Sequence, residues 1–149
     1  MWQTGKGFID QAVSTIAKLG TESVKAHEFI YEMDFAYAVA DVVVSRAGAL
    51  SVSELCLVAK PAILVPYPAA SEDHQTKNAL SLVEQDAAIL IKDSDTAADL
   101  VAEALNLLND AVKQEELRSN IRRLAKPTAA FDIAKEVLKL MPSQVSINI

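Results

Sequence analysis

Apolar residues along this chain follow two different spacings. In some segments they recur every three or four positions, which is the period of a helix with one buried face. In others they form short continuous runs rich in Val and Ile, which are typical of strands buried on both faces of a parallel sheet. Strand-like and helix-like segments alternate, and this predicts an α/β domain. The expected helices span residues 8–19, 33–40, 51–59, 73–84, 96–108, 113–124 and 129–140.

The strand-like segments are short and lie between these helices. Compact apolar runs are expected to form strands at 41–45, 62–66 and 87–91, with an extended segment at 23–30 and the end of a strand at 1–3. We therefore expect a Rossmann-like parallel sheet of about four to five strands flanked by helices. We expect a single domain over residues 1–141, truncated at its N-terminal edge, followed by a loose tail at 142–149.

Composition narrows the classes of function. The chain has 149 residues, of which 51% are apolar, but no run approaches the ~18 to 20 apolar residues that span a membrane. The net charge of −6 disfavours a nucleic-acid partner, which needs a surplus of Lys and Arg. The single cysteine, Cys56, suits a reducing compartment and lies on an apolar helical stripe, so we interpret it as core packing. The two histidines have no ligand-spaced partners, so no metal site is predicted.

Three loops contain the chemically unusual residues of the chain. In open parallel sheets, ligands bind beyond the carboxyl ends of the strands, where helix N-termini present unpaired N–H groups. This rule selects the loops 29–33, 45–54 and 67–78. The agreement between position and chemistry favours a binding site formed by these loops.

The second loop, residues 45–54, leads from a strand through a glycine turn into a helix. Gly48 permits a close backbone approach or a positive φ, and its small neighbours leave room for a diphosphate above the helix. The alternative is that the turn is only a connection. Glu54 also has two interpretations: a capping box with Ser51, which the spacing by itself favours, or a carboxylate that binds the hydroxyls of a ribose.

The third loop leads into a helix start that is dense in hydrogen-bonding groups. Gln75 and Asn78 share one helix face, and so do His74 and Asn78, which suits a neutral polyol such as a sugar. The alternative is a solvated helix start that is capped by Ser71.

The first loop contains the apolar trio Phe29, Ile30 and Met33. Its position after an extended segment permits a slot for a flat base, with backbone groups supplying the hydrogen bonds. The alternative is ordinary core packing, which the residues by themselves favour.

Taken together, these segments resemble the C-terminal domain of the MurG family. These enzymes are GT-B-fold N-acetylglucosaminyltransferases that make lipid II from lipid I in peptidoglycan synthesis. The resemblance covers about residues 2–140. Its matching segments are 2–7, 29–33, 37–50, 53–54, 60–66 and 73–79.

The resemblance implies a donor site for UDP-N-acetylglucosamine (UDP-GlcNAc). It also implies an inverting transfer in which helix N-terminal donors, rather than a metal or another cofactor, stabilise the leaving diphosphate. No catalytic residue is expected in this chain, because the general base would lie in the N-terminal domain of the enzyme. The implied contacts are Phe29, Ile30 and Met33 with uracil, Glu54 with ribose, Gly48, Ala49, Leu50 and Ser51 with diphosphate, and His74, Gln75 and Asn78 with the sugar.

The resemblance also implies partners and a location. The acceptor site and the membrane contact would belong to the N-terminal domain, at the cytoplasmic face of the bacterial plasma membrane, where the enzyme serves cell-wall growth, cell shape and division. We expect the present chain to transfer no sugar by itself and to bind UDP-sugars weakly at most. The apolar face at 133–138 of the last helix is expected to fold onto its own domain or to mediate self-association.

Two positions depart from the family pattern. Ala59 and Asp86 stand where the family usually has glycine, at helix C-termini that favour left-handed backbone. We expect a slightly different turn at Ala59 and an unchanged site.

Three other functions remain open at the level of sequence. One is another GT-B UDP-sugar transferase or epimerase, and a second is a non-catalytic nucleotide-binding subunit. The third is a plain α/β binding domain in which every polar cluster is a helix cap.

Overall fold

The computed structural model describes residues 1–140 as an α/β protein. Within this range the chain forms five strands, seven α-helices and two 3-10 helices. The strands are β1 (Trp2–Gln3), β2 (Ala26–His27), β3 (Val43–Ser45), β4 (Ala62–Leu64) and β5 (Ile89–Leu90). The helices are α1 (Ile9–Leu19), α2 (Met33–Val39), α3 (Ala49–Val58), α4 (His74–Val83), α5 (Thr96–Asn109), α6 (Ala111–Arg122) and α7 (Ala129–Lys139), with η1 (Ser71–Asp73) and η2 (Asp93–Asp95) preceding α4 and α5.

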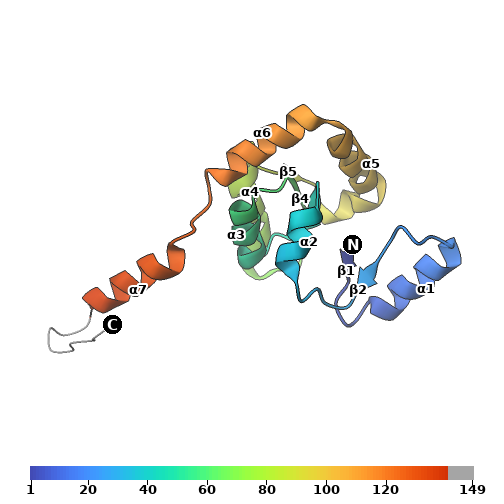
Figure 1. Ribbon diagram of the computed structural model, residues 1–149, viewed down its shortest axis with the longest axis horizontal. Coiled ribbons are helices and arrows are strands. Elements are labelled where there is room, and N and C mark those ends of the chain that lie inside the picture. Colours follow the sequence, from blue (N-terminus) through green and yellow to red (C-terminus); the bar gives the residue numbers. More distant parts are fainter. Residues whose placement is uncertain (141–149) are drawn as a thin grey trace.

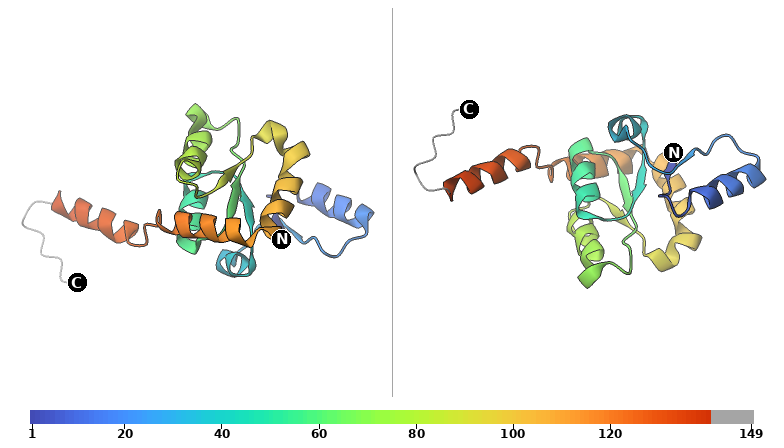
Figure 2. Two further views of the ribbon diagram at one scale, coloured as in Figure 1. Left: turned by 90° about the horizontal axis from the view of Figure 1, so that it is seen from above. Right: turned by 90° about the horizontal axis from the view of Figure 1, so that it is seen from below.

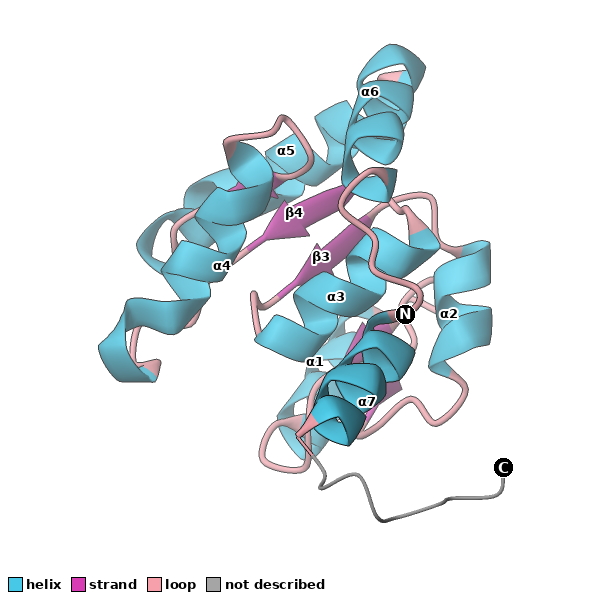
Figure 3. Cartoon of the chain, turned by 90° about the vertical axis from the view of Figure 1, so that its left-hand side faces the viewer, coloured by secondary structure: helices cyan, strands magenta, loops and turns pink. Residues whose placement is uncertain are grey.

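All strand pairs are parallel, as expected, but they form two sheets instead of one. The strands β3, β4 and β5 lie in that order, and β1 pairs only with β2. Figures 1 and 3 show the two-stranded sheet apart from the three-stranded one. The expectation of a single sheet was wrong because apolar runs predict strands but contain no information about which edges meet.

The three-stranded sheet lies between two layers of helices (Figure 2). Alternate residues of β4 point to opposite faces, because side chains alternate along a strand. Leu64 belongs to a core cluster shared with α3, α4 and the end of α6, whereas Ile63 joins Leu107 of α5 and Leu117 of α6. Cys56 is buried in the first cluster, and burial raises the pKa of its thiol. Its predicted role in core packing is confirmed.

The strands are shorter than the apolar runs that predicted them. The run 41–45 was expected to be fully buried, but Val44 in β3 is 46% exposed. This expectation was wrong because β3 is an edge strand that pairs only with β4. The extended segment 23–30 contains only the two-residue strand β2.

The turns at Ala59 and Asp86 both adopt left-handed backbone. Ala59, with φ of 51°, ends α3 and donates its N–H to Leu55 O. Asp86 has the same φ of 51° in the turn between α4 and β5. The predicted left-handed conformation is therefore confirmed at both positions.

The last helix, α7, extends away from the rest of the chain (Figures 1 and 2). All of its side chains are exposed, including the apolar Ile133, Val137 and Leu138. The prediction that this face folds onto its own domain was wrong. Residue 141 and the expected tail at 142–149 lie outside the described residues. Among the described helices, none has the length and apolarity needed to cross a bilayer.

Candidate functional site at the carboxyl ends of the strands

Arg46 connects the loops that follow β3, β4 and β5. Its Nη1 lies 3.3 Å from the backbone oxygens of both Val65 and Pro66, and it forms an ion pair with Asp93. The guanidinium also lies over the ring of Tyr67, 5.6 Å from the ring centre. The carboxyl ends of three adjacent strands are therefore held together by one side chain.

Gln75 and Asn78 at the start of α4 fix the same loops. Gln75 Oε1 accepts hydrogen bonds from the backbone N–H groups of Ala47 (3.2 Å) and Tyr67 (2.9 Å). Asn78 Nδ2 donates to the backbone oxygen of Ala47 at 3.0 Å. Two backbone donors on Gln75 and one backbone acceptor on Asn78 fix the orientation of both amides. The expected sugar-contacting residues thus hold the second and third loops together.

Glu54 does not belong to a capping box. α3 begins at Ala49 after the N-cap Gly48, so Ser51 lies inside the helix and no side chain caps it. The capping interpretation was wrong because it placed the helix start two residues too late. Glu54 Oε2 instead accepts a hydrogen bond of 3.1 Å from the hydroxyl of Tyr37 on α2.

The N-terminus of α3 is open. Gly48 has φ of −63°, so the backbone does not require glycine there, and the predicted option of a positive φ was wrong. A methyl group at Gly48 would meet only Ser51 Oγ, at 3.8 Å. Ala49 and Leu50 are exposed beside it. An uncapped helix start with free space above it leaves its first N–H groups available to an anion.

The helix start at His74 differs from the expected capped turn. Ser71–Asp73 forms a 3-10 helix, and Asp73 precedes α4 in a left-handed conformation with no side-chain cap. The capping interpretation of Ser71 was therefore wrong. His74 is exposed, with Nε2 at 3.5 Å from a carboxylate oxygen of Glu72.

Only some of the apolar side chains of the loop 29–33 pack against the core. Met33 packs against the main core cluster, whereas Phe29 is 56% exposed and meets Tyr31 edge-on, with ring centres 5.0 Å apart. The Ile30 N–H, expected to pair with a base, donates to Gln3 Oε1 at 2.8 Å. This loop leads into α2, whose Tyr37 contacts Glu54 at the end of the segment 45–54.

The comparison with protein families identifies the family of the chain. The family model described as the glycosyltransferase family 28 C-terminal domain matches residues 1–137. The chain belongs to this family. The match spans every element of the candidate site.

Named relatives of this family 28 domain share about half of its sequence. It is 48% identical over 145 residues to the UDP-N-acetylglucosamine–N-acetylmuramyl-(pentapeptide) pyrophosphoryl-undecaprenol N-acetylglucosamine transferase of Bacteroides thetaiotaomicron, covering 97% of this chain and 39% of that protein. It is 49% identical over 141 residues to the Bacteroides fragilis protein of the same name, covering 94% and 37%. The chain thus spans about two fifths of the length of these relatives.

A solved structure agrees with the sequence comparisons. The crystal structure of Acinetobacter baumannii MurG matches 93% of this chain, with a TM-score of 0.80 and 28% sequence identity. The chain covers 42% of that structure. The α/β fold of this family 28 domain is therefore the fold of the corresponding part of MurG.

Sequence reasoning missed three residues of the site in this family 28 domain, namely Tyr37, Arg46 and Asp93. Tyr37 lies within an apolar helical stripe, and a buried tyrosine usually needs a partner for its hydroxyl, so this signal was present. Arg46 and Asp93 are separated by 47 positions and gave no local signal.

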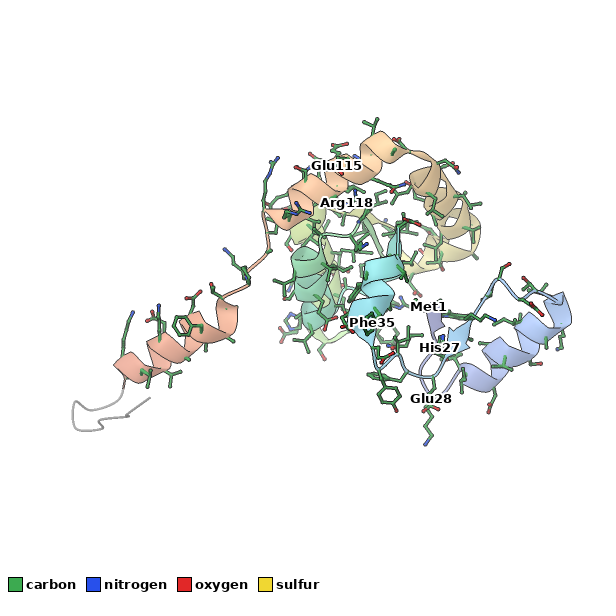
Figure 4. The ribbon with its side chains drawn as sticks, viewed as in Figure 1. Met1, His27, Glu28, Phe35, Glu115 and Arg118 are labelled. Carbon is green, nitrogen blue, oxygen red and sulfur yellow. The ribbon has the colours of Figure 1, made fainter. Side chains whose placement is uncertain are left out.

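The ion pair of Glu115 with Arg118 lies on α6, outside the three loops (Figure 4).

Proposed function

We propose that this chain is the donor-binding domain of an N-acetylglucosaminyltransferase that uses UDP-GlcNAc and a lipid-linked muramyl-pentapeptide acceptor. The observation that carries the proposal is the carboxylate of Glu54. It lies on the first two turns of a helix whose start is uncapped, is free of any capping role, and accepts a hydrogen bond from Tyr37. The names of the relatives supply the substrates.

The diphosphate would bind at the start of α3. Gly48 leaves space there, and the N–H groups of Ala49, Leu50 and Ser51 have no side-chain cap. An anion is stabilised at a helix N-terminus by these N–H groups and by the helix dipole. Neutralisation by fixed dipoles needs no metal, so we propose that the donor binds without a cofactor.

Glu54 would accept hydrogen bonds from the ribose hydroxyls. Uracil would lie against the loop 29–33, with the exposed ring of Phe29 and the partly buried Ile30 and Met33 supplying apolar contact. The Ile30 N–H would exchange its exposed bond with Gln3 for a bond to the base.

The sugar would bind near the start of α4. Gln75 and Asn78 each use one amide atom to hold the loops, which leaves Gln75 Nε2 and Asn78 Oδ1 to contact sugar hydroxyls. His74 is exposed beside them. The proposed contacts thus use the opposite ends of amides whose orientation the fold already fixes.

We further propose that transfer requires the part of the relatives that this chain does not span. That part would supply the general base, the acceptor site and the membrane contact at the inner face of the bacterial plasma membrane. The present chain would bind the donor weakly and transfer no sugar by itself.

Titration of UDP-sugars tests the proposal. We expect UDP-GlcNAc to bind the chain more tightly than UDP, because the proposed amide contacts extend to the sugar, and we expect EDTA to leave both affinities unchanged. NMR-detected titration measures these weak affinities. Tighter binding of another UDP-sugar would favour a different UDP-sugar enzyme, and a folded chain that binds no uridine nucleotide would overturn the proposal.

A further inference from the structure

Tyr37 connects the core to the candidate site. It lies on α2 with only 7% of its surface exposed and belongs to the main core cluster. Its hydroxyl donates to Glu54 Oε2 at 3.1 Å, across 17 positions of sequence. The ring is therefore fixed by packing, and the hydroxyl is held at one place beside an exposed carboxylate.

The direction of this hydrogen bond is well defined. Burial raises the pKa of Tyr37 to about 12, and the negative charge of Glu54 and the hydrogen bond to it act in the same direction. The hydroxyl is therefore protonated throughout the neutral range and serves as a donor, since a carboxylate can only accept.

The bond restricts Glu54 without using all of its acceptor sites. A glutamate side chain on the surface has large rotamer freedom, which a ligand must otherwise remove on binding. Tyr37 holds Oε2, and no hydrogen bond to Oε1 is found among residues 1–140. One oxygen is thus anchored, and the second is held ready to accept hydrogen bonds.

We propose that Tyr37 is a positioning residue that orients Glu54 and so sets the preference of the site for ribose over 2′-deoxyribose. The inference rests on the proposed function, in which Glu54 binds the ribose hydroxyls. An oriented carboxylate can accept hydrogen bonds from both ribose hydroxyls. A freely rotating carboxylate gains less binding free energy from the second of these hydrogen bonds. The specificity of a surface residue would thereby depend on a buried residue of a neighbouring helix.

The test compares UDP with 2′-deoxyUDP as ligands for the wild-type chain and for Tyr37→Phe. Phe keeps the ring in the core and removes only the hydroxyl. We expect the preference of Tyr37→Phe for UDP over 2′-deoxyUDP to fall by roughly three- to tenfold, the effect of one hydrogen bond. We expect its affinity for 2′-deoxyUDP to change by less than about twofold, which also shows that the site is folded.

Two further variants isolate the effect. Ser119→Ala removes a hydroxyl from an exposed residue of α6, outside the three loops, and we expect it to keep the wild-type preference. In a Glu54→Ala background, Tyr37→Phe should no longer change the preference, because the carboxylate it orients is gone.

Each remaining outcome has a definite meaning. Equal losses for both nucleotides, or an unchanged preference in Tyr37→Phe, would overturn the positioning role while leaving the donor site intact. A wild-type chain that binds UDP and 2′-deoxyUDP equally, with Glu54→Ala unchanged, would overturn ribose binding by Glu54 and the inference with it. A folded wild-type chain that binds neither nucleotide would overturn the proposed function itself.

Discussion

Gln75 serves the fold with one end of its amide and, in the proposed function, the sugar with the other. Its Oε1 accepts from the N–H groups of Ala47 and Tyr67. Ala47 is fully buried, so its N–H would be left without a partner if this oxygen were removed. The two roles can be separated because they use different atoms.

The substitutions Gln75→Ala and Gln75→Glu separate them. We expect Gln75→Ala to lower the free energy of unfolding by about 2 kcal/mol, because two backbone donors lose their acceptor. Gln75→Glu keeps an acceptor oxygen and should cost less than about 1 kcal/mol. It should nonetheless weaken binding of UDP-GlcNAc more than binding of UDP, because the Nε2 donor is lost. Urea denaturation and nucleotide titration give both quantities, and equal destabilisation by the two variants would contradict the account.

Much of the site could be predicted from the sequence at the level of residues, and the errors of that prediction have physical causes. The loops 45–54 and 67–78 were predicted to meet, and hydrogen bonds of Gln75 and Asn78 join them. The capping role of Ser51 and Glu54 was wrong, because a Ser-x-x-Glu pattern does not determine where the helix begins. The Arg46–Asp93 pair could not be predicted, since only the folded sheet brings the two residues together.

At the level of elements, periodicity predicted the helices well and the sheet less well. Each helix lies within a few residues of its expected range, because its apolar face repeats over several turns. Strands of two or three residues contain too little pattern to determine their neighbours, and the five strands form two sheets instead of one. The left-handed backbone conformation that was predicted at Ala59 and Asp86 is found at both positions.

The turn at Asp86 gives a test of this backbone conformation. With φ of 51° and an exposed side chain, Asp86→Gly should be more stable than Asp86→Ala by about 1 kcal/mol, because alanine is strained at positive φ. The matched control is the exposed Asn106 inside α5, where alanine should be more stable than glycine by about 1 kcal/mol. Urea denaturation measures all four variants, and the same order at both positions would contradict the assigned turn.

At the level of the whole molecule, packing among residues 1–140 leaves the apolar face of α7 uncovered. Ile133, Val137 and Leu138 are all exposed, and α7 extends away from the sheet (Figure 1). The remaining prediction is that this face mediates self-association, because a helix gains stability by burying its apolar stripe.

Sedimentation analysis over a range of concentrations tests this prediction. We expect the wild-type chain to show a mass that rises with concentration and Ile133→Asp to shift the equilibrium toward monomer, since a buried unpaired charge is costly. Lys139→Ser changes the polar side of the same helix and should behave like wild type. A wild-type chain that is strictly monomeric at every concentration would contradict the prediction.

The fold and the family of the chain are established over most of its length, whereas the roles of the site residues are proposals. The family model spans residues 1–137, and the relatives are about two and a half times as long as the part that this chain matches. Donor binding is the step that this chain can be tested for directly.

The measurement that tests the central claim most directly is titration of UDP-GlcNAc into the wild-type chain and into Glu54→Ala. The matched control is Glu115→Ala, which removes an exposed glutamate from α6, outside the three loops. We predict that Glu54→Ala weakens binding by roughly tenfold or more, the effect of losing hydrogen bonds to a charged group, and that Glu115→Ala binds like wild type. Unchanged affinity in Glu54→Ala would contradict ribose binding by Glu54 and, with it, the donor-site account.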